Sequence, residues 1–216
     1  MTASGRRTVE QVADALRHDV LTGALPAGRP VREEHLAERF GVSRHTVRSA
    51  LSRLVAQRLL TSEPYRGVRV TLLDDVQLAE LQQLRAAIEA EAVRALPAPA
   101  AELPGVREAI DRLAARERDG SPWIAVERAH AGVHQALVDA AGSARLSELY
   151  RSLEDELALL LLHTRPAFAD RDLAAEHRAL LAEVDARGPD AVRDHIDGST
   201  RDLLALRRTD AAPGPC

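Results

Sequence analysis

The sequence predicts a mainly α protein in two parts, an N-terminal winged helix-turn-helix and a C-terminal all-α bundle of about six helices. Residues 31–70 have the pattern of a helix, a tight turn, a second helix and a β-wing, whereas residues 73–208 follow helical periodicity almost throughout. The charge changes at the same place. Residues 1–72 carry 12 arginines against 7 acidic residues (net +5), and residues 73–216 carry 17 against 26 (net −9), which together give −4.

These changes along the chain predict its division into segments. We expect a disordered N-terminus at 1–8, a winged helix-turn-helix at 9–72, an all-α domain with a different role at 73–208 and a disordered tail at 209–216. The basic first domain suits nucleic acid, while phosphate would repel the acidic second domain. No apolar run approaches the roughly 20 residues that span a bilayer, and no signal peptide is evident, so we expect a cytoplasmic protein without membrane contact.

The first helices follow from apolar spacing. Residues 9–21 predict an amphipathic helix, and residues 25–30 a turn-rich connector. The next helix carries Leu36 and Phe40 at core spacing. Gly41 then supplies a tight turn, and Ser43 is a good N-cap for the helix that follows.

That second helix has the pattern of a recognition helix. Its inward positions are Val47, Ala50, Leu51 and Leu54, and its outer positions are Arg44, His45, Arg48 and Ser52. Two arginines one turn apart suit a major groove, because arginine can donate two hydrogen bonds to guanine.

A short wing is expected next. Residues 64–67 (Pro-Tyr-Arg-Gly) predict a turn and residues 68–70 a strand, which puts Arg66 near phosphate or the minor groove. The alternative is a helical hairpin with a solvated arginine face, but it would leave the glycine turn, the serine cap and the wing as coincidences. The pattern therefore predicts DNA binding.

The second half predicts helices separated by breaks rich in proline and glycine. We expect them at about 75–95, 104–119, 122–140, 144–163, 170–186 and 189–208. Inward faces are expected at Leu78, Leu81, Leu84 and Ile88, and at Leu149, Leu153, Leu157 and Leu160.

Histidines on these helices predict a metal site. His130 and His134 lie four residues apart on one helix face, and His177 and His195, on two later helices, can close on that face. Imidazoles from three helices suit a divalent metal such as Zn²⁺ or Ni²⁺. A single histidine on a helix is more often a partly exposed or hydrogen-bonded residue than a metal ligand. His163 is left out, because a histidine that ends a helix interacts with the helix dipole.

Catalytic patterns do not accompany these histidines. A zinc protease needs Glu directly after the first histidine of HExxH, but Ala131 follows His130 and Gln135 follows His134. A nucleophile elbow, a phosphate loop and a dinucleotide fingerprint are also missing from the sequence. We therefore expect the metal to bind a ligand, and we do not expect the protein to be an enzyme.

From about Val9 to Leu206 the chain resembles a GntR-family transcriptional regulator of the FadR subfamily, with a C-terminal FCD effector domain. The DNA-binding part of the resemblance is GALPAGRPVREEHLAERFGVSRHTVRSALSRL. The effector part is LRAAIEAEAVRAL, HAGVHQALVDAAGS, AEHRALLAEV and DHIDGSTRDLL.

The resemblance implies roles for individual residues. DNA contacts carry over to Ser43, Arg44 and Arg48, with Thr46 as a phosphate contact and Gly67 at the wing. The metal ligands of the family, one acidic residue and three histidines, carry over to His134, His177 and His195, while His130 stands at the acidic position. A neutral ligand there favours nitrogen-loving metals. The interval before His195 is about one turn short, and Ser199 occupies the alternative register.

The resemblance also implies how the protein works. We expect a homodimer on a palindromic double-stranded DNA operator, acting as a repressor that a small carboxylate effector relieves. Arg85 can hold that carboxylate, or it can form a solvated ion pair with Glu89. Two alternatives are a regulator that senses the metal itself and a metal-free regulator that binds a longer apolar acid or acyl thioester.

Overall fold

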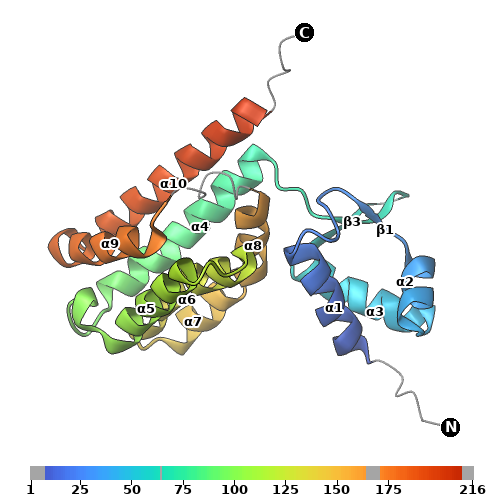
Figure 1. The fold of residues 1–216 in the computed structure, drawn as a ribbon, viewed down its shortest axis with the longest axis horizontal. Coiled ribbons are helices and arrows are strands. Elements are labelled where there is room, and N and C mark those ends of the chain that lie inside the picture. The colour runs from blue at the N-terminus through green and yellow to red at the C-terminus, as the bar shows by residue number, and fades with distance from the viewer. Residues whose placement is uncertain (1–7, 64, 164–170, 211–216) are drawn as a thin grey trace. The chain divides into compact units, whose positions relative to one another are not determined.

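The structure, a computed structural model, describes residues 8–63, 65–163 and 171–210 (Figure 1). The chain divides into two compact units, with the boundary between Leu72 and Leu73. The first unit is a winged helix-turn-helix and the second is all-helical, so the predicted fold class is confirmed. None of the helices in the described part of the chain has the length and apolar content that crossing a bilayer requires.

The first unit contains three helices and a small sheet. They are α1 (Val9–Leu21), β1 (Pro30–Val31), α2 (Glu33–Phe40), α3 (Arg44–Ala56), β2 (Leu60–Glu63) and β3 (Gly67–Val70). Both α1 and α2 pack on α3. Thr8 caps α1 in a reciprocal capping box with Gln11, so the prediction of disorder at residue 8 was wrong. The rest of that prediction, residues 1–7, lies outside the described residues.

Local chemistry sets the turn between α2 and α3. Gly41 ends α2 with φ +66°, a left-handed conformation that glycine adopts at low cost. Ser43 then caps α3, its Oγ accepting a hydrogen bond from the Thr46 N–H at 3.1 Å. The apolar face of α3 is buried as its spacing predicts, which leaves the opposite face to solvent.

The sheet has the order β1-β3-β2 and is antiparallel. Val31 of β1 pairs with Val68, and Leu60 of β2 pairs with Val70. Strand β1 was not predicted, because two residues are too few for a periodic signal and they follow a turn-rich connector. Pro64, placed in the wing turn from sequence, lies outside the described residues.

The second unit is a helical bundle. Its helices are α4 (Asp75–Arg94), the 3₁₀ helix η1 (Ala100–Glu102), α5 (Pro104–Arg118), α6 (Trp123–Ala140), α7 (Ala144–Arg151), α8 (Glu154–His163), α9 (Leu173–Arg187) and α10 (Pro189–Asp210). Figure 1 shows the long α10 running beside α4, and these two helices are in contact, as are α5 and α6. Helix α6 also contacts α4 and α9, so it lies at the centre of the bundle.

Two helix predictions for this unit were wrong. The single helix expected at 144–163 is two helices, because the chain turns at Ser152, whose Oγ donates to the Leu149 carbonyl at 2.6 Å. The described part of the unit therefore has seven α-helices where six were expected. Helix α10 also continues to Asp210, into the segment expected to be disordered, while residues 211–216 lie outside the described residues.

The inward face of α4 differs from the prediction. Leu78, Leu81 and Ile88 are buried, but Leu84 is 41% exposed. Arg85 takes the inward position next to it, because it follows Leu81 and Leu78 at helical spacing. Leu149 of α7 was also expected inside and is 46% exposed. The bundle thus buries polar groups where the sequence pattern predicted leucine.

Candidate functional site

The exposed face of α3 carries the residues that sequence assigned to DNA. Arg44, His45 and Arg48 are all exposed there. The two arginines pair with consecutive glutamates of α2: Arg44 lies 2.8 Å from Glu34, and Arg48 donates two hydrogen bonds to Glu33, at 3.1 and 2.9 Å. The hydrogen bond from Arg48 holds the pKa of Glu33 below its usual range.

Ser43 and Thr46 lie at the start of the same helix. Ser43 Oγ lies 2.9 Å from Thr46 Oγ1 and accepts the Thr46 N–H, so both residues take part in the helix cap. Both are half-buried. Their assigned DNA contacts stay predictions, while the capping role that the sequence predicted for Ser43 is confirmed.

The wing carries Arg66 and Gly67. Arg66 is exposed and lies 3.4 Å from Glu63, and Gly67 has φ +76°. Tyr65, to which the sequence assigned no functional role, is fully exposed and has φ +64°. A bulky residue in the left-handed region is uncommon. The feature of the sequence that could have singled out Tyr65 is that an aromatic residue stands within a polar turn.

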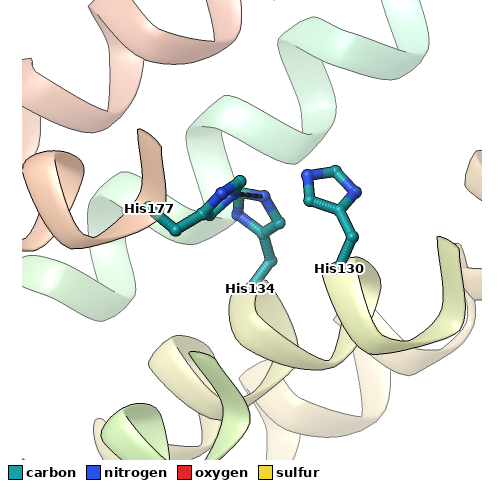
Figure 2. Close-up of side chains that lie close together, drawn as sticks. All are labelled: His130, His134 and His177. Atoms are coloured by element: carbon teal, nitrogen blue, oxygen red, sulfur yellow. Dashed lines mark hydrogen bonds between the residues drawn. The ribbon is translucent and has the colours of Figure 1, made fainter. Parts of the chain in front are cut away.

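Three of the four predicted metal ligands come together in the helical unit. His130 and His134 on α6 and His177 on α9 are buried, and each offers a ligand atom within 4.8 Å of the others (Figure 2). His195 on α10 lies beside them, with its ring centre 5.2 Å from that of His177 and 5.8 Å from that of His134. His195 is not part of the three-histidine group.

Hydrogen bonds orient two of these rings. His134 Nδ1 lies 3.0 Å from a Glu89 carboxylate oxygen, and His177 Nδ1 lies 2.6 Å from the Leu173 carbonyl. Both partners accept hydrogen bonds, so each Nδ1 carries the proton. The two Nε2 atoms are then bare, and they face each other at 2.9 Å, the contact drawn dashed in Figure 2.

Glu89 of α4 organises the polar groups around the histidines. It is fully buried and accepts hydrogen bonds from Arg85 Nε at 2.7 Å and from the Tyr150 hydroxyl at 2.6 Å, besides that of His134. Burial alone would raise its pKa, but the charge of Arg85 and the hydrogen bonds from His134 and Tyr150 outweigh burial and hold the pKa of Glu89 well below its usual range. It therefore remains a carboxylate.

The histidines themselves are kept neutral. Burial, the largest cause, lowers the pKa of His130, His134 and His177, and it lowers the pKa of His195 to about 3. Neutral imidazole is the form that ligates metals. The three-histidine group therefore offers nitrogen lone pairs at neutral pH.

A pocket of about 150 Å³ opens beside these histidines. It is lined by Arg85, Arg128, His130, Ala131, Gly132, His134, Gln135, Tyr150, Arg151, Glu154, Leu157 and Leu161. Arg85 lines the pocket and also pairs with Glu89. The pair is buried, so the solvated version of it expected from sequence was wrong.

A winged helix-turn-helix with exposed arginines on α3, joined to a helical unit whose pocket is lined partly by buried polar groups, defines a DNA-binding regulator with a ligand-binding domain. The chain belongs to the gntR family of bacterial regulatory proteins. The family's DNA-binding region matches residues 8–70, and an FCD domain matches residues 80–199. The first unit is thus the DNA-binding part of a transcriptional regulator and the second its effector-binding part.

Known relatives cover most of the chain. It is 34% identical to the HTH-type transcriptional regulator BphR of Paraburkholderia xenovorans, over 91% of this chain and 85% of that protein. It is 31% identical to a "Probable D-xylose utilization operon transcriptional repressor" of Paenarthrobacter nicotinovorans, over 86% and 82%. The crystal structure of a GntR protein from Rhodococcus sp. RHA1 matches with a TM-score of 0.77 and 26% identity, over 91% and 97%.

Proposed function

We propose that this transcriptional regulator is controlled by a small carboxylate that binds next to a divalent metal in the helical unit. His130, His134 and His177 would hold the metal, and Arg85 would hold the carboxylate in the adjoining pocket. The metal would supply positive charge for the acid's oxygens.

The facing Nε2 atoms of His134 and His177 carry this proposal. Two nitrogen lone pairs at 2.9 Å repel each other unless a cation lies with them. A shared proton is disfavoured, because burial lowers the pKa of both rings. A metal ion removes the repulsion, and the bonds of about 2.0–2.1 Å between zinc and histidine suit nitrogens that already lie close together. The residues therefore fit a metal.

The donor set favours Zn²⁺ or Ni²⁺. All three ligands are neutral nitrogens, since histidine stands at residue 130, and imidazole suits these borderline ions better than Mg²⁺ or Mn²⁺. Glu89 and the Leu173 carbonyl accept hydrogen bonds from Nδ1 of His134 and of His177, which leaves each Nε2 for the metal. Such partners fix the tautomer of metal-binding histidines. His195, whose ring centre lies 5.2 Å from that of His177, is the candidate for a fourth ligand.

The pocket supports a small effector over a long one. A cavity of about 150 Å³ holds a molecule of roughly benzene size. An acyl thioester is many times larger, which argues against the metal-free alternative. Catalysis also lacks support, because the oxygens of Glu89 are occupied by three donors and cannot act as a general base.

For the DNA-binding part, we infer a homodimer on a palindromic operator. A single winged helix contacts one half-site, and a two-fold dimer places two such helices about one DNA turn apart. The name of the relative from Paenarthrobacter nicotinovorans includes "repressor". By analogy, the effector would relieve repression.

The test is the elemental metal content of the full-length protein, purified without chelators or affinity-tag nickel. We expect about one metal per chain in the wild type and in a His18→Ala control, whose histidine is exposed on α1. The His134→Ala variant should lose the metal while keeping its helical circular dichroism. Absence of metal from a folded wild type would refute the metal proposal.

Chelation separates the carboxylate proposal from metal sensing. DNA for this assay is selected from a random library by the wild-type protein. If the carboxylate is the signal, removing the metal alone changes the affinity for that DNA by less than about tenfold, and small acids release it only from the metal-loaded protein. A larger change without any acid would make the metal itself the signal.

A further inference from the structure

The pocket beside the histidines has a buried floor and a charged rim. Its floor is formed by Arg85, His130, His134 and Tyr150, all of which are buried. Its rim carries the exposed side chains Arg128, Arg151 and Glu154. Leu157 and Leu161 add buried apolar side chains to the lining. The lining therefore combines buried polar groups, exposed charged groups and apolar side chains.

The rim carries more positively charged side chains than negatively charged ones. Arg151 lies 3.3 Å from Asp139, but both side chains of this pair are about half exposed, and such pairs are weak. Arg128 forms no ion pair within the part of the chain that the structure describes. Glu154 is the one carboxylate among the lining residues of the pocket. Two guanidinium groups therefore face one carboxylate at the pocket mouth.

We propose that the effector carries two carboxylates, one bound at the floor by Arg85 and the histidine site, and one bound at the rim by Arg128 and Arg151. This inference rests on the proposed function and names its ligand class, a short dicarboxylate of about four or five carbons. A pocket of this volume holds about six to nine non-hydrogen atoms, and a four-carbon dicarboxylate has eight.

The chemistry of each region fits one part of such a molecule. Arginine binds carboxylate with two parallel hydrogen bonds, so Arg128 or Arg151 can hold the outer group in a fixed orientation. The methylene carbons would lie against Leu157 and Leu161. A monocarboxylate would contact the floor and the leucines but would make no use of the rim.

Calorimetric titration of the metal-loaded, full-length protein tests this with acids matched in carbon number. We expect succinate and glutarate to bind at least tenfold more tightly than butyrate and valerate. In an Arg128→Gln, Arg151→Gln double variant, dicarboxylate affinity should fall to the monocarboxylate level, with butyrate affinity changed less than twofold. An Arg145→Gln control removes an exposed arginine of α7 that does not line the pocket and should behave as wild type.

The outcomes separate this inference from the function on which it rests. Equal affinity for the two acid classes, with both bound, would overturn the second carboxylate site and leave a monocarboxylate regulator. A double variant that keeps the full preference for dicarboxylates would overturn the roles of Arg128 and Arg151. Binding of neither class to a metal-loaded protein would overturn the carboxylate proposal and this inference together.

Discussion

At the residue scale, Arg48 is the clearest test of DNA reading. Its side chain is 66% exposed and pairs with Glu33 on the surface, so a guanine can replace the glutamate at little cost. We expect Arg48→Ala to weaken binding to library-selected DNA by about 1–3 kcal/mol, with less effect on unrelated DNA. Fluorescence anisotropy with both DNAs measures this.

Arg53→Ala is the matched control for that variant. Arg53 lies in the last turn of the same helix and pairs with Glu10 of α1. It should leave the preference for selected DNA unchanged. If Arg48→Ala and Arg53→Ala weaken both DNAs equally, Arg48 contributes only charge and reads no base.

Glu89 should control metal affinity without touching the metal. Its carboxylate holds the Nδ1 proton of His134, and loss of such an outer partner typically costs 10–100-fold in metal affinity. We expect a loss of about that size in Glu89→Gln, measured by competition with a metal-binding dye.

Glu91→Gln serves as control, since Glu91 is exposed on the same helix. The Glu89→Gln change leaves Arg85 buried beside an amide, so circular dichroism and thermal unfolding must accompany the metal titration. Wild-type metal affinity in a folded Glu89→Gln protein would show that this carboxylate does not orient the site.

Glu127 predicts a pH dependence of stability. Burial raises the pKa of this carboxyl to about 7, with Glu154 and Asp155 adding to the shift and Arg128 opposing it. The folded protein therefore holds this proton more strongly than the unfolded chain, and stability from this group is lost as pH rises from about 4.5 to 7.

Glu127→Gln removes that effect. At pH 8 we expect the free energy of unfolding of the variant to be about 1–3 kcal/mol higher than that of the wild type. Near pH 4.5 we expect the two proteins to have nearly equal free energies of unfolding. Urea unfolding at both pH values measures it. A difference independent of pH would show that the carboxyl does not titrate between these values.

Sequence reasoning found the histidines because helical spacing puts His130 and His134 on one face. It missed the contacts of Glu89 with His134 and with Tyr150, because these contacts depend on helices that meet only in the folded bundle. The Arg85 to Glu89 spacing did predict an ion pair. Spacing alone could not show that this pair is buried, since burial depends on which face of α4 the neighbouring helices cover.

At the scale of elements, the turn between α2 and α3 depends on Gly41. Its φ of +66° costs other residues about 1–2 kcal/mol, and a Cβ there would meet no atom within 4 Å, so the cost is conformational alone. We expect Gly41→Ala to lower the stability of the DNA-binding unit by about that amount. Gly105→Ala, in α5 with φ outside the left-handed region, should instead stabilise by about 0.4–1 kcal/mol.

Differential scanning calorimetry of both variants checks this prediction. A Gly41→Ala protein as stable as wild type would mean that the turn relaxes to a right-handed conformation.

Element boundaries were predictable where a residue type marks them. Gly41 and Ser43 mark the ends of α2 and α3, and the structure has both helices as expected. The break between α7 and α8 has no proline or glycine, only Ser152 and Leu153, so periodicity ran through it. Serine also makes such local hydrogen bonds inside helices, so Ser152 by itself did not mark the break.

At the scale of the whole molecule, the two units divide DNA binding and effector binding between them. The charge difference predicted this division, because a domain of net −9 is repelled by phosphate while one of net +5 is attracted. An effector in the acidic unit can regulate DNA binding only if it binds more tightly to one of two arrangements of the protein.

That requirement makes regulation reciprocal. If the effector weakens binding to selected DNA by a given factor, saturating DNA must weaken effector binding by the same factor, which we expect to be about 5–150-fold. Calorimetric titration of succinate into metal-loaded protein, with and without selected DNA, gives the factor by which DNA weakens succinate binding. Fluorescence anisotropy of the DNA, with and without succinate, gives the factor by which succinate weakens DNA binding. Unrelated DNA at the same phosphate concentration controls for charge. A factor that keeps growing with succinate or DNA concentration and reaches no plateau would mean that the acid competes with DNA directly, and does not act through a change in the protein.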